Sequence, residues 1–324
     1  MGRRPKSATV IDLDSARGGR GQAVLPAHGP VVADDGVGLY TEDSGGAGPA
    51  LFFVYGLGCT IRHWKYPMAY FGDAAPETRR HRQIWSDFRG HGHSDPVLPG
   101  QRLTIGRIVD DLKSVCAARG VKRATFLGQS MGASIVLELA HAVPELVSGL
   151  VLLTPPGRSP APFLPAQPLS KLAWDFMVKL NERLPLVVRL GYALGEPMRA
   201  TKVWSAMLRE FIRHTGFNPE LARTEDIDEY IDKIFRVNPN LFYDMAGDLD
   251  KFDVADFERP INCPTLIIAG GRDRVVPFTE VKRLAALMPH AEICLVRHGS
   301  HCPHFDDPGF VNRSIAEFLK KHGL

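Results

Sequence analysis

Gly128-Gln129-Ser130-Met131-Gly132 is a G-x-S-x-G pattern, and it lies between a predicted strand at residues 124–127 and a predicted helix at residues 131–141. A strand-to-helix turn of this kind holds a serine hydroxyl clear of its surroundings, with glycines where side chains would clash. It also places Ser130 at the positive end of a helix, where backbone N–H groups can stabilise a developing oxyanion. We therefore predict that Ser130 is a catalytic nucleophile, and the alternative is a purely structural turn.

Around this turn, short apolar runs alternate with segments of helical spacing. Strands are predicted at residues 30–33 and 37–41, which form a hairpin, and at 51–55, 83–86, 124–127, 149–153, 265–269 and 292–296. Apolar residues recur with helical spacing at 105–119, 131–141, 279–287 and 308–321. This alternation is typical of an α/β fold, with a mostly parallel central sheet and helices on both faces.

The alternation is interrupted between residues 155 and 250, where no strand-like run occurs. This segment begins with six prolines between Pro155 and Pro168 and continues as an apolar stretch with helical spacing. We predict a helical cap at 155–250, inserted into a core formed by 29–154 and 251–324. The cap contains candidate substrate contacts, and the alternative is that they only form its own core; these are Trp174, Met177 and Trp204.

A serine nucleophile needs a base, and the base needs an acid that orients it. Asp273 lies in the loop at 270–277, directly after the predicted strand at 265–269, and is the candidate acid. The alternative is a loop aspartate that caps a turn. The other usual place for the acid, the loop after 149–153, contains no carboxylate.

Three histidines, His298, His301 and His304, are candidates for the base, and they follow the last predicted strand. Asp306 and Pro308 come after His301 in a pattern that turns a loop into a helix while presenting His301 toward the strand ends. We predict that His301 is the base and that His304 packs or caps the loop. A zinc site at this cluster is disfavoured because no second Cys or His cluster accompanies it. We expect no metal and no other cofactor.

Residues 51–58 form an apolar strand that runs into a turn flanked by glycines. Such a turn can direct the N–H of Leu57 at a substrate carbonyl oxygen, and the N–H of Met131 would be the second donor of an oxyanion hole. Tyr55, Gly56 and Gln129 border this turn and are further candidate substrate contacts.

The composition is that of a globular protein, with 44% hydrophobic and 23% charged residues. No apolar run approaches the roughly 18 residues that a membrane span needs. Five scattered cysteines without a C-x-x-C pair argue against a disulfide framework and against a Cys-based zinc site.

The net charge of +3 resides in residues 1–28, which have five basic and two acidic side chains. The remaining chain sums to zero, so it has no basic excess that would suggest nucleic-acid binding. We expect this Gly- and Arg-rich tail to be disordered. The alternative is a basic tail that contacts anionic lipid or RNA. Arg3-Arg4 is not followed by an apolar segment, so an export signal is disfavoured and the predicted location is the cytoplasm.

Together these motifs resemble the α/β-hydrolase superfamily, in the capped branch of bacterial serine esterases and related hydrolases, over residues 30–322. The matching motifs are the Gly56 to Gly58 turn, the Asp87 to Asp95 loop, the Ser130 elbow, and the Asp273 and His301 loops. The resemblance implies a central sheet of about eight strands with a helical cap after the sixth. It also implies that the loop at 87–95 is structural, so His91 and His93 are expected to be loop residues without a catalytic role.

The chain departs from this branch at Tyr55-Gly56, where His-Gly is common. Tyr55 either packs in the core or its hydroxyl reaches the pocket. The subfamily therefore stays open at this point.

These observations predict hydrolysis of a small carboxylic ester, with an apolar acyl or alcohol part, through an acyl-enzyme. The same triad would serve a thioesterase, lactonase, amidase or carbon-carbon bond hydrolase. A ligand-binding receptor on the same fold is the non-catalytic alternative. An oligomer is possible, but nothing in the sequence indicates one.

Overall fold

The computed structural model of the chain describes residues 29–72, 81–163, 168–194, 202–234 and 237–324. The tail at 1–28, which the sequence predicts to be disordered, lies outside the described residues. None of the described helices has the length and apolar character that crossing a bilayer requires.

Eight strands form one sheet in the order β1-β2-β4-β3-β5-β6-β7-β8. The pairs β1/β2 and β2/β4 are antiparallel, and the other five pairs are parallel. The predicted α/β class with a mostly parallel sheet is therefore confirmed. The strands are β1 (Gly29–Val32), β2 (Gly38–Asp43), β3 (Ala50–Val54), β4 (Arg82–Ser86), β5 (Ala124–Gln129), β6 (Val147–Leu153), β7 (Thr265–Gly270) and β8 (Ala291–Val296).

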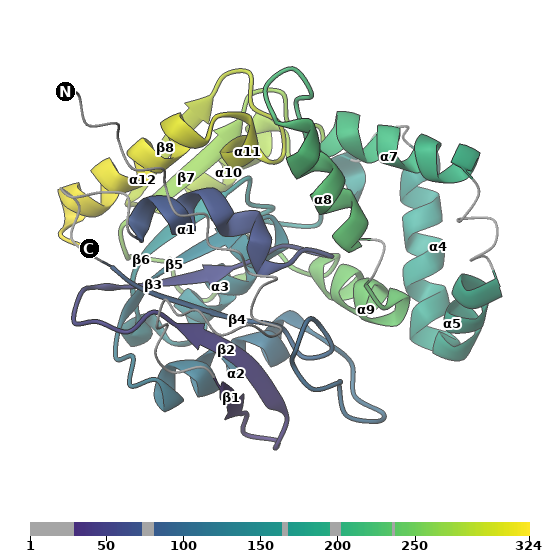
Figure 1. Ribbon diagram of the computed structural model, residues 1–324, viewed down its shortest axis with the longest axis horizontal. Helices are drawn as coiled ribbons and strands as arrows, with labels where there is room; N and C mark the ends of the chain where they lie inside the picture. Colours follow the sequence, from purple (N-terminus) through teal and green to yellow (C-terminus); the bar gives the residue numbers. More distant parts are fainter. Residues whose placement is uncertain (1–28, 73–80, 164–167, 195–201, 235–236) are drawn as a thin grey trace, which may run out of the picture.

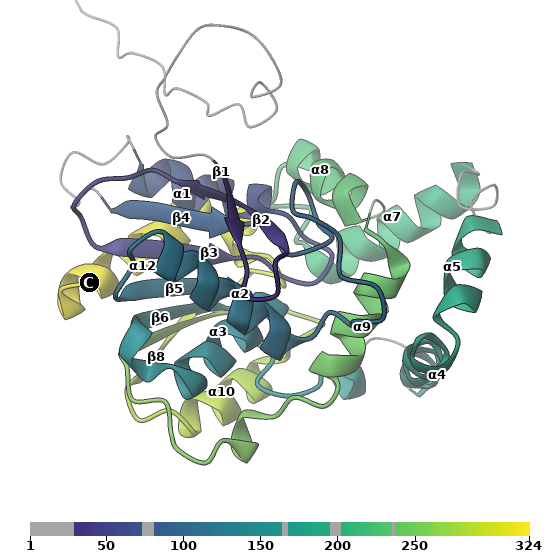
Figure 2. The same ribbon diagram turned by 90° about the horizontal axis from the view of Figure 1, so that it is seen from below.

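Helices cover both faces of this sheet (Figures 1 and 2). On one face lie α1 (Lys65–Phe71) and α12 (Pro308–His322), and on the other lie α2 (Ile105–Ala118), α3 (Met131–Ala142) and α10 (Phe278–Ala286). Every residue of β3, β5 and β7 is buried, because both sides of these central strands are covered. This explains why the strands read as continuous apolar runs in the sequence.

Between β6 and β7 the chain forms a helical insertion. Its helices are α4 (Leu169–Arg183), α5 (Pro185–Leu194), α7 (Lys202–Gly216), α8 (Thr224–Ile234) and α9 (Pro239–Leu249). In Figures 1 and 2, α8 and α9 lie between the sheet and the outer helices α4 and α5.

Polar contacts fix the inner helices of the insertion to the core. Asp226 of α8 accepts hydrogen bonds from Lys65 Nζ at 2.5 Å and from the Tyr66 hydroxyl. Asp248 of α9 accepts one from the backbone N–H of Ile105 at 2.7 Å, at the start of α2. The insertion is therefore attached through α8 and α9.

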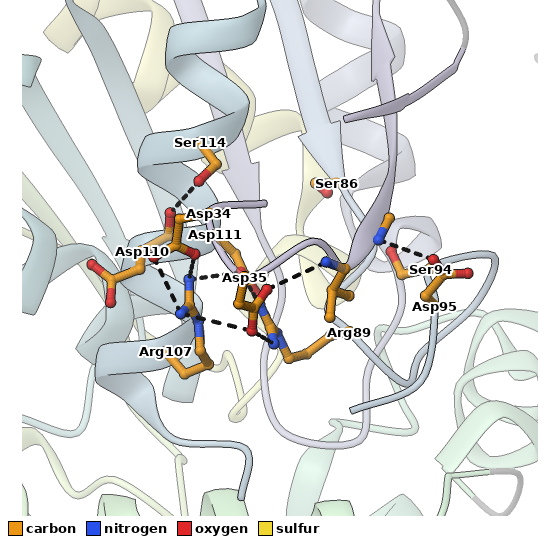
Figure 3. A network of polar contacts seen from close by, with 12 residues as sticks. Asp34, Asp35, Ser86, Arg89, Ser94, Asp95, Arg107, Asp110, Asp111 and Ser114 are labelled. Atoms are coloured by element: carbon orange, nitrogen blue, oxygen red, sulfur yellow. Dashed lines mark hydrogen bonds and ion pairs between the residues drawn. The ribbon is translucent and has the colours of Figure 1, made fainter. Parts of the chain in front are cut away.

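The loop at residues 87–95 is held by a buried arginine (Figure 3). Arg89 is fully buried and binds Asp111 of α2 at 2.8 Å and Asp35 of the β1–β2 hairpin at 2.7 Å. Arg107 of α2 pairs with Asp34 beside it. These contacts join the loop to α2 and to the β1–β2 hairpin. Removing one partner would leave an uncompensated buried charge, which is strongly destabilising.

Candidate active site

The backbone at Ser130 has the strained geometry of a nucleophile elbow. Its φ and ψ are 52° and −123°, and its N–H donates to Leu153 O of β6 at 2.9 Å. A Cβ on Gly132 would lie 2.4 Å from Val54 O, and one on Gly128 would lie 2.5 Å from Gly132 O. These approaches to backbone atoms explain the two glycines of the pattern.

A chain of two hydrogen bonds joins Asp273, His301 and Ser130. His301 Nε2 lies 2.9 Å from Ser130 Oγ, and His301 Nδ1 lies 2.8 Å from Asp273 Oδ2. The three residues follow β5, β7 and β8, whose carboxyl ends meet at one edge of the parallel sheet. The structure thus brings together the three residues that the sequence predicts as the triad.

Further hydrogen bonds hold both partners of the serine in place. The second oxygen of Asp273, Oδ1, accepts hydrogen bonds from the N–H groups of Val275 at 2.7 Å and Val276 at 2.9 Å. Thr154, with a φ of 46°, donates its hydroxyl to His301 O at 2.9 Å. Thr154 occupies the loop without a carboxylate, and no pattern in the sequence indicates this contact.

The other two histidines of the cluster have different surroundings. His304 is buried and stacks on Trp64, with ring centroids 5.7 Å apart, and burial lowers the pKa of His304 to about 3. His298 is exposed. Within the described residues, His301 is the histidine that contacts Ser130.

A buried carboxylate shapes the loop that contains His301. Asp306 accepts hydrogen bonds from Ser300 N at 2.5 Å and Ser300 Oγ at 2.7 Å, and from Asn218 N at 3.0 Å. Burial raises the pKa of Asp306. The spacing of Asp306 after His301 therefore has a structural reason, since this carboxylate closes the loop.

The turn after β3 lies directly against the elbow. It is closed by Cys59 N donating to Gly56 O at 3.1 Å, and a Cβ on Gly56 would lie 3.2 Å from Ser130 Cβ. Leu57 is half-buried within this turn, and Met131 is buried at the start of α3. The two predicted oxyanion donors therefore belong to the two segments that flank Ser130.

All three candidate substrate contacts beside this turn, Tyr55, Gly56 and Gln129, are buried. The Tyr55 hydroxyl accepts a hydrogen bond from Phe88 N at 2.7 Å, its ring lies 4.2 Å from that of Phe88, and the side chain is 1% exposed. Of the two roles that the sequence leaves open for Tyr55, the structure shows the packed one, with the hydroxyl bonded to the backbone. Gln129 is also 1% exposed, and its side-chain amide has no hydrogen-bond partner within the described part of the chain.

The inner helices of the insertion contact the turn at 56–59. A Cβ on Gly58 would lie 3.5 Å from Ile234 of α8 and 3.7 Å from Phe242 of α9. The Cys59 thiol donates to the Tyr230 hydroxyl of α8 at 3.4 Å, and burial raises the pKa of Cys59 to about 12. These neighbours are not distinguishable from other apolar residues of the insertion in the sequence.

The predicted contacts from the cap lie farther along the insertion. Trp174 and Met177 are half-buried on α4, where the buried side chains Val178 and Asn181 meet α9. The side chain of Trp204 lies outside the described residues. All five cysteines are free, and no group of three or more metal-ligating side chains occurs in the described ranges.

Comparisons with known proteins agree with this architecture. A protein of Pseudomonas savastanoi pv. phaseolicola named as a carbamate hydrolase, RutD, is 28% identical over 271 residues, which are 84% of this chain and 93% of that protein. A thermophilic esterase from Thermogutta terrifontis superposes with a TM-score of 0.71 at 22% identity, over 92% of this chain and all of the esterase. The enol-lactonase from Burkholderia xenovorans LB400 superposes with a TM-score of 0.69 at 17% identity, over 91% of this chain and all of that chain.

A family model described as the alpha/beta hydrolase fold matches residues 49–308. This range begins just before β3 and ends at the start of α12, so it includes the Ser130 elbow and both partner loops. The chain belongs to the alpha/beta hydrolase family.

Proposed function

We propose that the chain is a serine hydrolase that cleaves a carboxylic ester with an apolar acyl or alcohol part. The observation that carries this proposal is the continuous hydrogen-bonded chain from Asp273 through His301 to Ser130, with contacts of 2.8 and 2.9 Å. A serine, a base in contact with it and an acid that orients the base are the parts that covalent acyl transfer needs.

In this mechanism Ser130 Oγ attacks the ester carbonyl while His301 Nε2 takes its proton. The tetrahedral oxyanion is held by the N–H groups of Leu57 and Met131, each worth roughly 2.7 to 4 kcal/mol in the transition state. His301 then protonates the leaving alkoxide, and an acyl-enzyme on Ser130 results. Water, activated by His301, releases the carboxylic acid and restores the serine.

The apolar preference rests on what lies beside the turn at 56–59. Ile234 and Phe242 face Gly58 from the helical insertion, so a substrate bound at the oxyanion turn would meet apolar side chains. In this role the insertion is a cap over the site, and α8 and α9 are its substrate-facing part.

A carbamate is the second candidate substrate, because a relative at 28% identity is named as a carbamate hydrolase. Attack on a carbamate carbonyl passes through a similar tetrahedral species, so the same three residues would serve. Thioester, lactone, amide and carbon-carbon bond cleavage remain chemically compatible with the triad for the same reason.

The test measures hydrolysis of p-nitrophenyl esters of increasing acyl length, beside a p-nitrophenyl carbamate with a matched alkyl group. The parent is compared with Ser130→Ala and with Ser114→Ala, which changes a serine of α2 instead. We expect ester turnover with an optimum along the series, a loss of roughly four to six orders of magnitude in kcat for Ser130→Ala, and parental rates for Ser114→Ala.

Faster turnover of the carbamate than of every ester would move the second candidate to first place. Failure of a fluorophosphonate to label Ser130 would overturn serine catalysis altogether. Labelling without turnover of any ester or carbamate would assign the triad to another bond.

A further inference from the structure

The outer helices of the insertion expose a set of large apolar side chains. Exposed fractions range from 47% for Val187 to 80% for Leu194. Single exposed apolar residues are common on protein surfaces, but a cluster of them marks an interaction site. We define the α4–α5 apolar face as Leu169, Leu172, Phe176, Leu186, Val187, Leu190 and Leu194.

The exposed apolar side chains of α4 lie on the side of the helix opposite the one that packs against α9. Leu169, Leu172 and Phe176 are spaced three and four residues apart, so they follow one another along one side of the helix. The buried residues of α4 are Val178, which packs against Gly247 of α9, and Asn181, which donates to Asp244 at 2.8 Å. Figures 1 and 2 show α4 and α5 at the outer end of the insertion, on the far side of α9 from the sheet.

Basic side chains lie beside the α4–α5 apolar face. Lys179 and Arg183 continue the stripe of α4, and Arg189 lies on α5; all three are exposed, and none forms an ion pair with another described residue.

The neighbouring acidic side chains form ion pairs with other basic residues. Asp175 pairs with Lys171 at 2.7 Å, and Glu182 pairs with Lys251 at 3.0 Å. The face therefore combines apolar side chains with an excess of positive charge.

We propose that the α4–α5 apolar face docks on an anionic lipid bilayer. Leucine and phenylalanine side chains enter the boundary between headgroups and acyl chains, while Lys and Arg contact lipid phosphates. The helices lie in the plane of the interface, so the contact needs no membrane-spanning segment.

A second copy of the chain fits this face less well. In a two-fold symmetric contact the same surface of each copy meets its partner, so two surfaces that both carry Lys179, Arg183 and Arg189 would be brought together. Repulsion among these charges disfavours a dimer, whereas anionic phosphates compensate them.

The experiment is co-sedimentation of the full chain with vesicles of phosphatidylglycerol and, separately, of phosphatidylcholine. One variant is Leu172→Gln with Phe176→Gln, and its control carries Leu98→Gln with Ile293→Gln, two exposed apolar residues outside the face. The other is Lys179→Gln with Arg183→Gln and Arg189→Gln, and its control is Lys122→Gln with Arg313→Gln and Lys320→Gln. Residues 1–28 are the same in every protein, so only differences between matched variants are counted.

We expect the parent to bind phosphatidylglycerol vesicles much more tightly than phosphatidylcholine vesicles. The charge variant should lose about fivefold for each cation removed, and the apolar variant at least about tenfold, while both controls bind as the parent does.

Equal binding by the variants and the parent, or no binding to phosphatidylglycerol, would overturn the proposal. Concentration-dependent dimerisation in light scattering that the apolar variant abolishes would overturn it in favour of a second copy. Because binding is measured without substrate, its outcome is independent of the proposed ester hydrolysis.

Discussion

Asp273 has a side chain that is 1% exposed and has hydrogen bonds to both of its oxygens, whereas Leu194 at the end of α5 is 80% exposed. Around Ser130, glycine backbones approach other backbone atoms so closely that a methyl group has no room. On α4 and α5, large apolar side chains are exposed to solvent. The contrast shows where the molecule is constrained by its own packing and where its surface is free for an external partner.

The largest expected effect is on kcat, which Asp273→Asn beside Ser130 should lower and a matched change on α4 should not. Loss of the acid leaves His301 in the wrong tautomer, and kcat for a p-nitrophenyl ester should fall by about four orders of magnitude. Asp175→Asn on α4 is the matched change and should leave kcat unaltered. A loss of less than about tenfold in Asp273→Asn would show that this aspartate does not orient the base.

A methyl group at Gly132 tests how tightly the elbow is packed. The added Cβ would lie 2.4 Å from Val54 O and 2.6 Å from Tyr55 O, and these backbone atoms belong to a central strand and the turn after it. Gly132→Ala should therefore lower the free energy of unfolding by about 1 to 3 kcal/mol, measured by urea denaturation. Parental stability in this variant would mean that the elbow can relax.

Acid should lower the free energy of unfolding through the buried side chain of His304. Burial lowers the pKa of His304 from an ordinary 6.5 to about 3, so the unfolded chain binds more protons between these values. The stabilising contribution is complete above about pH 6.5 and is lost as the pH falls toward the folded value.

Between pH 7.5 and 5.5, His304→Phe should lose about 1.4 kcal/mol less stability than the parent does. The measurement is urea denaturation at both pH values, with His214→Gln on α7 as the control, because that side chain is exposed. An identical pH dependence in His304→Phe and the parent would contradict the assignment.

The smallest effect has the opposite sign and is expected in α5. Gly191 lies within this helix, and a Cβ built there meets no atom within 4 Å. Gly191→Ala should raise the free energy of unfolding by about 0.4 to 1 kcal/mol, because alanine restricts the unfolded chain more than glycine does. Destabilisation by this variant would show that the outer helix is packed against a partner.

Much of the core is predictable from the sequence because its periodicity is strong. The eight strands lie within one or two residues of the predicted ranges, and the insertion follows the sixth strand as the resemblance implies. Ser130, Asp273 and His301 are predictable as a set because each follows a strong strand, and the carboxyl ends of parallel strands meet at one edge. The α1 helix is not predicted, since its seven residues contain a proline and are apolar at nearly every position, so that no periodicity stands out.

The surroundings of the site are less predictable because they depend on how the insertion packs. Tyr55 could pack or contact substrate, and no pattern in the sequence predicts its hydrogen bond from Phe88 N. Ile234 resembles many other apolar residues of the insertion until it is placed beside Gly58. Thr154 has no sequence signal, because its contact is with the backbone of His301.

The two buried cysteines near Ser130 and His301, Cys59 and Cys302, should react slowly with thiol reagents. Only the thiolate reacts readily with oxidants and alkylating reagents, and burial raises the pKa of Cys59 to about 12. Burial also raises the pKa of Cys302, next to His301, well above its ordinary value. At neutral pH both sulfurs remain protonated and shielded from solvent. We therefore expect the proposed serine chemistry to need no reducing agent and to tolerate iodoacetamide, which would inactivate a hydrolase with a cysteine nucleophile.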